Sequence, residues 1–179
     1  MNKVRITSEL REMARKLGKQ RDDEAKKHRR IRVDNEGKNS TFLMHWQGAY
    51  CDMLVPWMYD FIELSQPLFI EGVFTQGNDF IINGKEYEGK CNRIPFLDTV
   101  DTYFINVQKH ATALKRGARG IICTAIDGEP DVALEFCVFG WMPIDIPMRY
   151  KPETKYVSPQ YTIPFQEIRD ILELKEVAD

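Results

Sequence analysis

The sequence is poor in the residues that build zinc sites and disulfide frameworks. Its 179 residues include only four cysteines and three histidines, and no two cysteines form a C-x-x-C pair. Each cysteine lies in an apolar or strand-like stretch, which is typical of a reduced, buried thiol. The four positions are Cys51, Cys91, Cys123 and Cys137. We therefore expect neither a zinc site nor a disulfide framework.

Long apolar runs are also missing. No segment approaches the roughly 18 residues that a helix needs to span a bilayer. The first residues, MNKVRITSELREMARK, lack the apolar centre of a signal peptide. We therefore expect a cytoplasmic protein without a membrane partner. With 43% hydrophobic and 29% charged residues, the chain has enough apolar content for the core of one globular domain over residues 1–179.

The net charge of −2 conceals an uneven distribution. Residues 1–38 hold 13 Lys and Arg against 7 Asp and Glu, whereas residues 39–179 hold 12 against 20. A basic arm ahead of an acidic body could supply contacts to nucleic-acid phosphates. A solvated helix of mixed charge explains the same pattern equally well, because acids are interspersed among the basic residues.

The spacing of apolar residues predicts alternating helices and strands. The expected helices are 7–30, 42–64, 101–116 and 164–174, and the expected strands are 68–75, both arms of a hairpin within 78–90, 120–126 and 132–141. Pro56 introduces a kink into the second helix. In the third helix the inward residues are Phe104, Val107, Ala111 and Leu114. Residues 143–163 are rich in Pro and Tyr and predict an extended surface segment.

The hairpin carries the most informative charges. Asn83-Gly84 favours a two-residue type I′ turn, and the resulting register sets Asp79 directly opposite Glu88. Opposed residues have Cβ atoms about 4.5–5.5 Å apart, so two carboxylates there repel each other and favour a bound cation. Mg²⁺ or Mn²⁺ prefers such oxygen ligands. Lys90 lies on the same face as Glu88, which adds an ammonium group to the predicted metal site.

A simpler interpretation competes with this metal site. A Glu-x-Lys triplet is expected about once by chance in a chain of this composition. The hairpin face could therefore be a solvated surface with alternating charges. The opposed Asp79 is the feature that favours a metal site.

With this hairpin, the order of predicted elements resembles the PD-(D/E)XK nuclease superfamily, whose shared αβββαβ core carries acids on its second and third strands. The resemblance covers residues 42–139. It implies an α/β fold with a restriction-endonuclease-like core, in which helices flank a mixed central sheet. Residues 1–38 would form a basic helical arm and residues 140–179 a C-terminal extension, so that helical extensions lie at both ends of the core.

The resemblance also assigns site residues. Asp79 stands at the first acid of the family, Glu88 at the second and Lys90 at the lysine. Gly48-x-x-x-Asp52 is similar to the Gly-x-x-x-Glu pattern of members with an additional acid on the helix, so Asp52 becomes a further metal ligand. Two departures are Asn78, where the family has proline, and Gly89, where it has an apolar residue.

Some members also place a glutamine or a tyrosine on the second helix, facing the site. Gln108 and Tyr103 are the candidates for this accessory role, although both also fit as ordinary surface or packing residues. Phe139-Gly140-Trp141 and the closing YTIPFQEIRDIL are similar to phage-encoded members. A phage-encoded protein would act in the host cytoplasm.

The implied activity is Mg²⁺- or Mn²⁺-dependent hydrolysis of DNA phosphodiester bonds. A protein that keeps the nuclease fold but only binds DNA, or serves in an assembly, is the main alternative. A generic α/β interaction domain unrelated to nucleases is a third. The sequence leaves open whether the nucleic acid is DNA or RNA and whether it is linear, branched or single-stranded. A symmetric homodimer would supply two sites for cutting a duplex.

Overall fold

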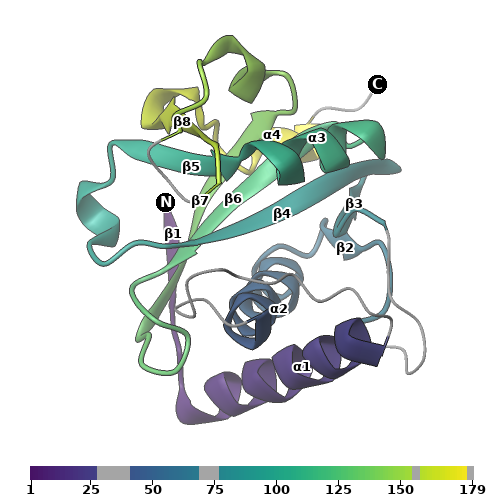
Figure 1. Cartoon of the computed structure of the whole chain (residues 1–179), viewed down its shortest axis with the longest axis vertical. Helices are drawn as coiled ribbons and strands as arrows, with labels where there is room; N and C mark the ends of the chain where they lie inside the picture. The colour runs from purple at the N-terminus through teal and green to yellow at the C-terminus, as the bar shows by residue number, and fades with distance from the viewer. Residues whose placement is uncertain (28–40, 69–76, 155–157, 177–179) are drawn as a thin grey trace.

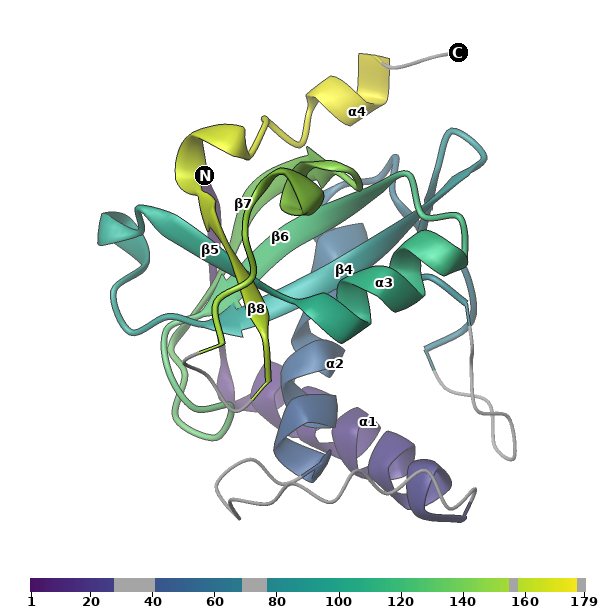
Figure 2. The same ribbon diagram turned by 45° about the horizontal axis from the view of Figure 1, so that its top comes forward.

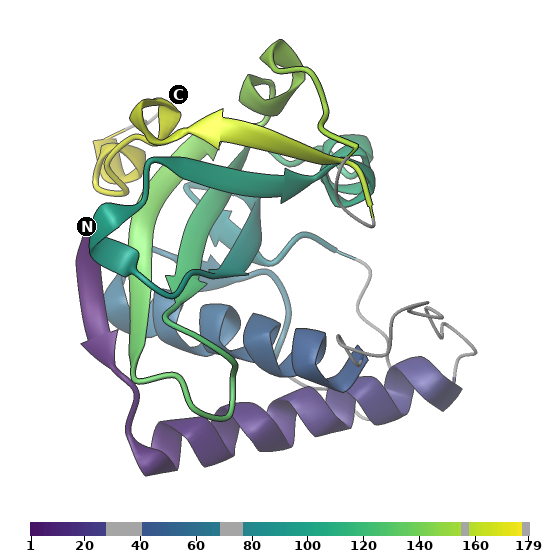
Figure 3. The same cartoon turned by 60° about the vertical axis from the view of Figure 1, so that its left-hand side comes forward.

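The computed structural model describes residues 1–27, 41–68, 77–154 and 158–176. In these ranges the fold is α/β, with a curled, mixed six-stranded sheet of order β1-β7-β6-β4-β3-β2. Helices α1 (Ser8–Lys27) and α2 (Thr41–Met58) lie on one side of the sheet. The two-stranded sheet of β5 (Thr102–Asn106) and β8 (Gln160–Pro164) lies on the other side (Figures 1 and 3). The general α/β class expected from the sequence is therefore present.

Helices α1 and α2 pack closely against each other, and α2 packs against the sheet (Figure 2). A Cβ added at Gly18 would lie 2.6 Å from the Trp46 Cα atom, so the two backbones meet where α1 has no side chain. α2 ends at Met58, before the predicted boundary at residue 64, and a short strand, β2 (Glu63–Leu64), follows it. Pro56 lies inside the last turn of the helix.

The hairpin forms as its turn residues predict. β3 (Phe80–Ile82) and β4 (Lys85–Arg93) are joined by Asn83 and Gly84, which have φ values of 50° and 71°. Positive φ at both positions is the signature of a type I′ turn. The pairs Ile82–Lys85, Ile81–Glu86 and Phe80–Tyr87 are confirmed. The expected strand at 68–75 falls almost wholly in residues 69–76, which lie outside the described residues.

The remaining strands complete the sheet around β4. β6 (Gly120–Ile126) runs parallel to β4, and β7 (Glu135–Pro143) runs antiparallel to β6. An unexpected strand, β1 (Asn2–Arg5), pairs with β7 and closes the far edge. Both core strands were expected near these positions, because short apolar runs bounded by turn residues favour buried strands.

The predicted helix at 101–116 is half wrong. The first part is strand β5, and only Val107–Lys115 forms helix α3. Tyr103 and Ile105 alternate with less buried residues and are themselves fully buried, which is a strand pattern. Asn106 then starts the helix, because its Oδ1 atom accepts the Lys109 N–H at 3.0 Å.

The predicted C-terminal helix at 164–174 is also wrong. Pro164 is the last residue of β8, and among the described residues beyond it the α-helix is limited to α4, Glu173–Glu176. Phe165–Glu167 forms one turn of 3-10 helix, and the helix cannot continue because Arg169 exchanges two backbone hydrogen bonds with Trp141, at 2.8 and 3.0 Å. Gly140 allows this approach, since a Cβ there would lie 2.0 Å from the Arg169 carbonyl oxygen.

Two apolar clusters fill the spaces on either side of the sheet. One lies between the sheet and the helical layer of α1 and α2, and the other lies between the sheet and β5–β8. Among the described residues, no helix has the length and apolar character needed to cross a membrane.

Candidate active site

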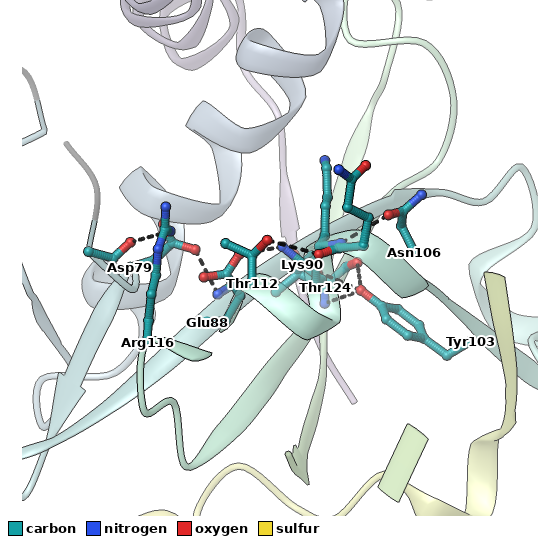
Figure 4. A network of polar contacts seen from close by, with 12 residues as sticks. Asp79, Glu88, Lys90, Tyr103, Asn106, Thr112, Arg116 and Thr124 are labelled. Atoms are coloured by element: carbon teal, nitrogen blue, oxygen red, sulfur yellow. Dashed lines mark hydrogen bonds and ion pairs between the residues drawn. The ribbon is translucent and has the colours of Figure 1, made fainter. Parts of the chain in front are cut away.

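Asp79 lies where β3 separates from β4. The regular ladder ends at Phe80–Tyr87, and the Asp79 N–H donates to the Tyr87 carbonyl at 3.1 Å. Asp79 thus bonds to the residue that pairs with Phe80, and it has no ladder partner of its own. The expected direct opposition of Asp79 and Glu88 is therefore not part of the ladder. Instead, Asp79 Oδ2 accepts the Gly89 N–H at 2.8 Å (Figure 4).

Gly89 is glycine because its neighbours leave no room for a side chain. A Cβ atom there would lie 2.7 Å from Phe80 Cε2, 2.9 Å from Cys51 Sγ and 3.2 Å from Asp79 Oδ2. Phe80 and Cys51 are both buried. The departure from an apolar residue at this position thus has a local steric reason, and it lets the Asp79 carboxylate reach the β4 backbone.

Glu88 and Lys90 form an ion pair on one face of β4. Their side chains are both 13% exposed, so the pair is largely removed from water. Lys90 and Glu88 are two residues apart on the strand and therefore point the same way. Figure 4 draws the pair together with Asp79.

Asp52 comes from α2 and is paired with an arginine that the sequence did not identify. Its Oδ2 atom lies 2.5 Å from Arg21 Nη1, and its side chain is 11% exposed. Arg21 belongs to α1 and also donates from Nη2 to the Leu68 carbonyl at 3.2 Å. Arg21, Asp52 and Asp79 line the same hollow, together with residues 64–68 and 77–78.

The three carboxylates influence one another electrostatically. Burial raises the pKa of Asp79 well above its usual value, and the charges of Asp52 and Glu88 raise it further. Lys90 and the Gly89 N–H act in the opposite direction. Burial also raises the pKa of Asp52, although the Arg21 guanidinium opposes that rise. Burial and the neighbouring acids therefore favour the neutral form of Asp79, and a cation bound there would favour its ionised form.

Tyr103, one of the two accessory candidates, is a buried packing residue. It lies on β5 rather than on a helix, and its Oη atom is 2.5 Å from the Lys90 carbonyl oxygen and 2.9 Å from that of Thr124. The same Oη atom accepts the Thr124 N–H at 3.1 Å, and Thr124 Oγ1 donates to the Lys90 carbonyl at 3.0 Å. Tyr103 thus fixes the β4 and β6 backbones beneath Lys90 (Figure 4).

Gln108, the other accessory candidate, lies on α3 and is exposed. Its backbone carbonyl accepts a hydrogen bond from Thr112 Oγ1 at 2.9 Å. Asn78 stands where the nuclease family that the sequence resembles has proline. It is buried and donates from Nδ2 to Glu86 Oε2 at 2.6 Å. This bond holds the residue next to Asp79 against β4.

The donor chemistry of the site suits a hard divalent cation. Asp52, Asp79 and Glu88 offer carboxylate oxygens, which Mg²⁺ and Mn²⁺ prefer. In the part of the chain that the structure describes, no three His, Cys, Asp or Glu side chains are arranged as a ready-made metal cluster. When all three carboxylates are ionised, they carry one more negative charge than Arg21 and Lys90 neutralise. A divalent cation would offset this excess.

Comparison of the chain with protein-family models, with curated proteins and with solved structures gives no significant match. The functional argument therefore depends on the residues themselves. Arg21 is the main residue that the sequence reasoning missed. One signal was available: Ala14, Leu17, Gly18 and Ala25 form the buried stripe of α1, and Arg21 occupies the same stripe at helical spacing. An arginine in a buried stripe predicts a buried acidic partner.

Proposed function

We propose that this protein is a metal-dependent nuclease that hydrolyses DNA phosphodiester bonds through a PD-(D/E)XK-type site with Mg²⁺ or Mn²⁺. The observation that carries the proposal is the grouping of Asp79, Glu88 and Lys90 around Gly89, at the point where β3 leaves β4. Carboxylates and an ammonium in a poorly solvated corner are the groups that phosphodiester hydrolysis requires.

The order of elements supports the same proposal. Between residues 41 and 126 the chain runs α2, β2, β3, β4, β5, α3, β6. Apart from β5, which belongs to the second sheet, this is the αβββαβ order of the nuclease core that the sequence resembles. Asp79 lies next to the second strand of that series, and Glu88 lies on the third.

In this proposal each residue of the site has its own role in phosphodiester hydrolysis. Asp79 and Glu88 would hold the metal, with Asp52 as the third carboxylate of the set. A bound Mg²⁺ or Mn²⁺ supplies polarisation of the phosphate and a lower pKa for bound water. Lys90 orients the attacking water and stabilises negative charge that develops on the phosphate oxygens. A bond forms between the water oxygen and phosphorus, and the bond from phosphorus to the 3′ oxygen breaks.

A second candidate is a protein of the same fold that binds DNA without cutting it. The observation favouring it is that each acid already has a partner within the chain. Asp52 pairs with Arg21, Asp79 accepts the Gly89 N–H, and Glu88 pairs with Lys90. A site whose carboxylates are paired in this way can keep its arrangement without a metal.

Metal binding and cleavage together discriminate the two candidates. We would incubate the protein with linear, nicked, branched and single-stranded DNA and with RNA, in Mg²⁺, Mn²⁺ or EDTA, beside Lys90→Ala. A nuclease gives a metal-dependent product that the variant does not form. If the protein binds DNA tightly but forms no product, and if it shows no Mn²⁺ binding that Asp79→Ala abolishes, the result would establish the DNA-binding protein instead. If duplex DNA is cut on both strands, a homodimer with two sites is the expected assembly.

A further inference from the structure

Arg21 is the charged residue of the hollow to which the hydrolytic chemistry gives no role, and it is paired with Asp52. We propose that Arg21 binds a phosphate of the DNA backbone, and that Asp52 is the residue that positions it. This inference rests on the proposed nuclease function. It adds a substrate-binding residue from α1, outside the segment 42–139, and it changes the role of Asp52 from metal ligand to positioning residue.

The contacts of Arg21 leave it able to bind an anion. A guanidinium carries five N–H donors. The hydrogen bonds to Asp52 and to the Leu68 carbonyl use one donor on each terminal nitrogen. The side chain is 25% exposed and lines the same hollow as Asp79. A phosphate bound through a metal at Asp79 would therefore have a cation within the same hollow to receive an oxygen.

Asp52 is suited to positioning because it is buried and fixed. Its carboxylate is an acceptor only, and Arg21 is the cation that it contacts in the described structure. A planar guanidinium held by a carboxylate keeps a defined orientation, which a lysine ammonium would not. The close contact of Gly18 with Trp46 locks α1 to α2, three residues before Arg21 on one helix and six residues before Asp52 on the other. The pair is thus placed by the packing of the two helices.

The first test measures the affinity for a fluorescently labelled DNA duplex in Mg²⁺, in a Lys90→Ala background that blocks cleavage. Arg21→Ala is expected to weaken binding by about tenfold, because a hydrogen bond to a charged group is lost. The slope of log Kd against log salt should fall by about 0.9, the value for one phosphate contact. A purely structural role would leave this slope unchanged.

Arg15→Ala is the matched control. Arg15 lies on the same helix, is exposed and contacts Glu12 at 3.5 Å. Its removal should leave the slope unchanged. An equal loss of slope in Arg15→Ala and Arg21→Ala would show that α1 acts as a general basic surface, and this would overturn the proposal. Arg21→Gln keeps most of the side-chain volume and replaces Arg21→Ala if thermal unfolding shows that the alanine variant does not fold.

The second test asks whether Asp52 acts through Arg21. Asp52→Asn should weaken DNA binding as much as Arg21→Ala, and the double variant should be no weaker than either, because the two residues act as one unit. Mn²⁺ affinity should stay within about twofold of the wild type in both, while Asp79→Ala reduces it at least about tenfold. A loss of Mn²⁺ affinity in Asp52→Asn equal to that in Asp79→Ala would make Asp52 a ligand and overturn the assignment.

Failure of this inference can be distinguished from failure of the proposed function. Wild-type protein that neither binds Mn²⁺ nor cleaves DNA contradicts the nuclease function itself. Wild-type protein that does both, with Asp79→Ala inactive and Arg21→Ala unchanged in salt slope, contradicts only the role of Arg21.

Discussion

Replacing Gly89 by alanine is expected to destabilise the protein and to slow DNA cleavage. The added Cβ would meet Phe80 Cε2 at 2.7 Å and Cys51 Sγ at 2.9 Å, both closer than Cβ contacts normally come. Phe80 is 0% exposed and Cys51 is 2% exposed, so neither can turn away into solvent. Overpacking of this kind costs about 1–3 kcal/mol.

The expected change in melting temperature follows from that cost. For a chain of this length, about 2 kcal/mol lowers the melting temperature by about 4–8 °C. The same Cβ would lie 3.2 Å from Asp79 Oδ2, so the carboxylate moves away from the Gly89 N–H and cleavage slows along with the loss of stability.

The assay is thermal unfolding by circular dichroism, combined with the rate of Mg²⁺-dependent cleavage. Gly48→Ala is the control, because Gly48 lies in α2 and a Cβ there would have no neighbour within 4 Å. Alanine in a helix is about 0.5–1 kcal/mol more stable than glycine, so this control should melt slightly higher than the wild type. A Gly89→Ala protein that melts and cleaves like the wild type would refute the close packing of Asp79 against β4.

Two further predictions concern Asp79 and Tyr103. Because the pKa of Asp79 is raised in the folded protein, its ionisation opposes folding: the protonated form is favoured below that pKa, and stability is lost as pH rises through it. Asp79→Asn should therefore raise the melting temperature at neutral pH, with a gain that shrinks as pH falls through the raised pKa; a gain that is independent of pH would contradict this. Tyr103→Phe should lower the free energy of unfolding by about 1–3 kcal/mol, because the buried N–H and carbonyl groups of Thr124 lose a partner. Tyr150→Phe is the control and should cost less, since it loses a contact to Glu167. Urea unfolding measures both, and equal costs would count against the role given to Tyr103.

The hairpin was predictable because its determinants are local. Asn83 and Gly84 select the turn, and the turn sets the pairs from Ile82–Lys85 to Phe80–Tyr87. The ladder ends before Asp79, whose side chain instead accepts the Gly89 N–H, and the turn residues do not determine that contact. Asp79, Glu88, Lys90 and Asp52 nevertheless lie in one region of the fold, close enough to affect the pKa of Asp79.

The errors arise where distant parts of the chain pair. Thr102–Asn106 has apolar spacing that also fits a helix, but it pairs with β8, more than 50 residues later. Leu114, expected to point inward, is 40% exposed. β1 was expected to be part of a helical arm, and it pairs instead with β7 at the other end of the domain. Arg21 was missed for the same reason, since Asp52 lies on a different helix.

The most direct test of the nuclease function is the rate of Mg²⁺-dependent DNA cleavage by the wild type and by Asp79→Ala, Glu88→Ala and Lys90→Ala. Circular dichroism spectra confirm that each variant is folded. We predict cleavage by the wild type that EDTA abolishes, and loss of that cleavage in all three folded variants. Undiminished cleavage in the three variants would contradict the assignment of the active site to this end of the hairpin.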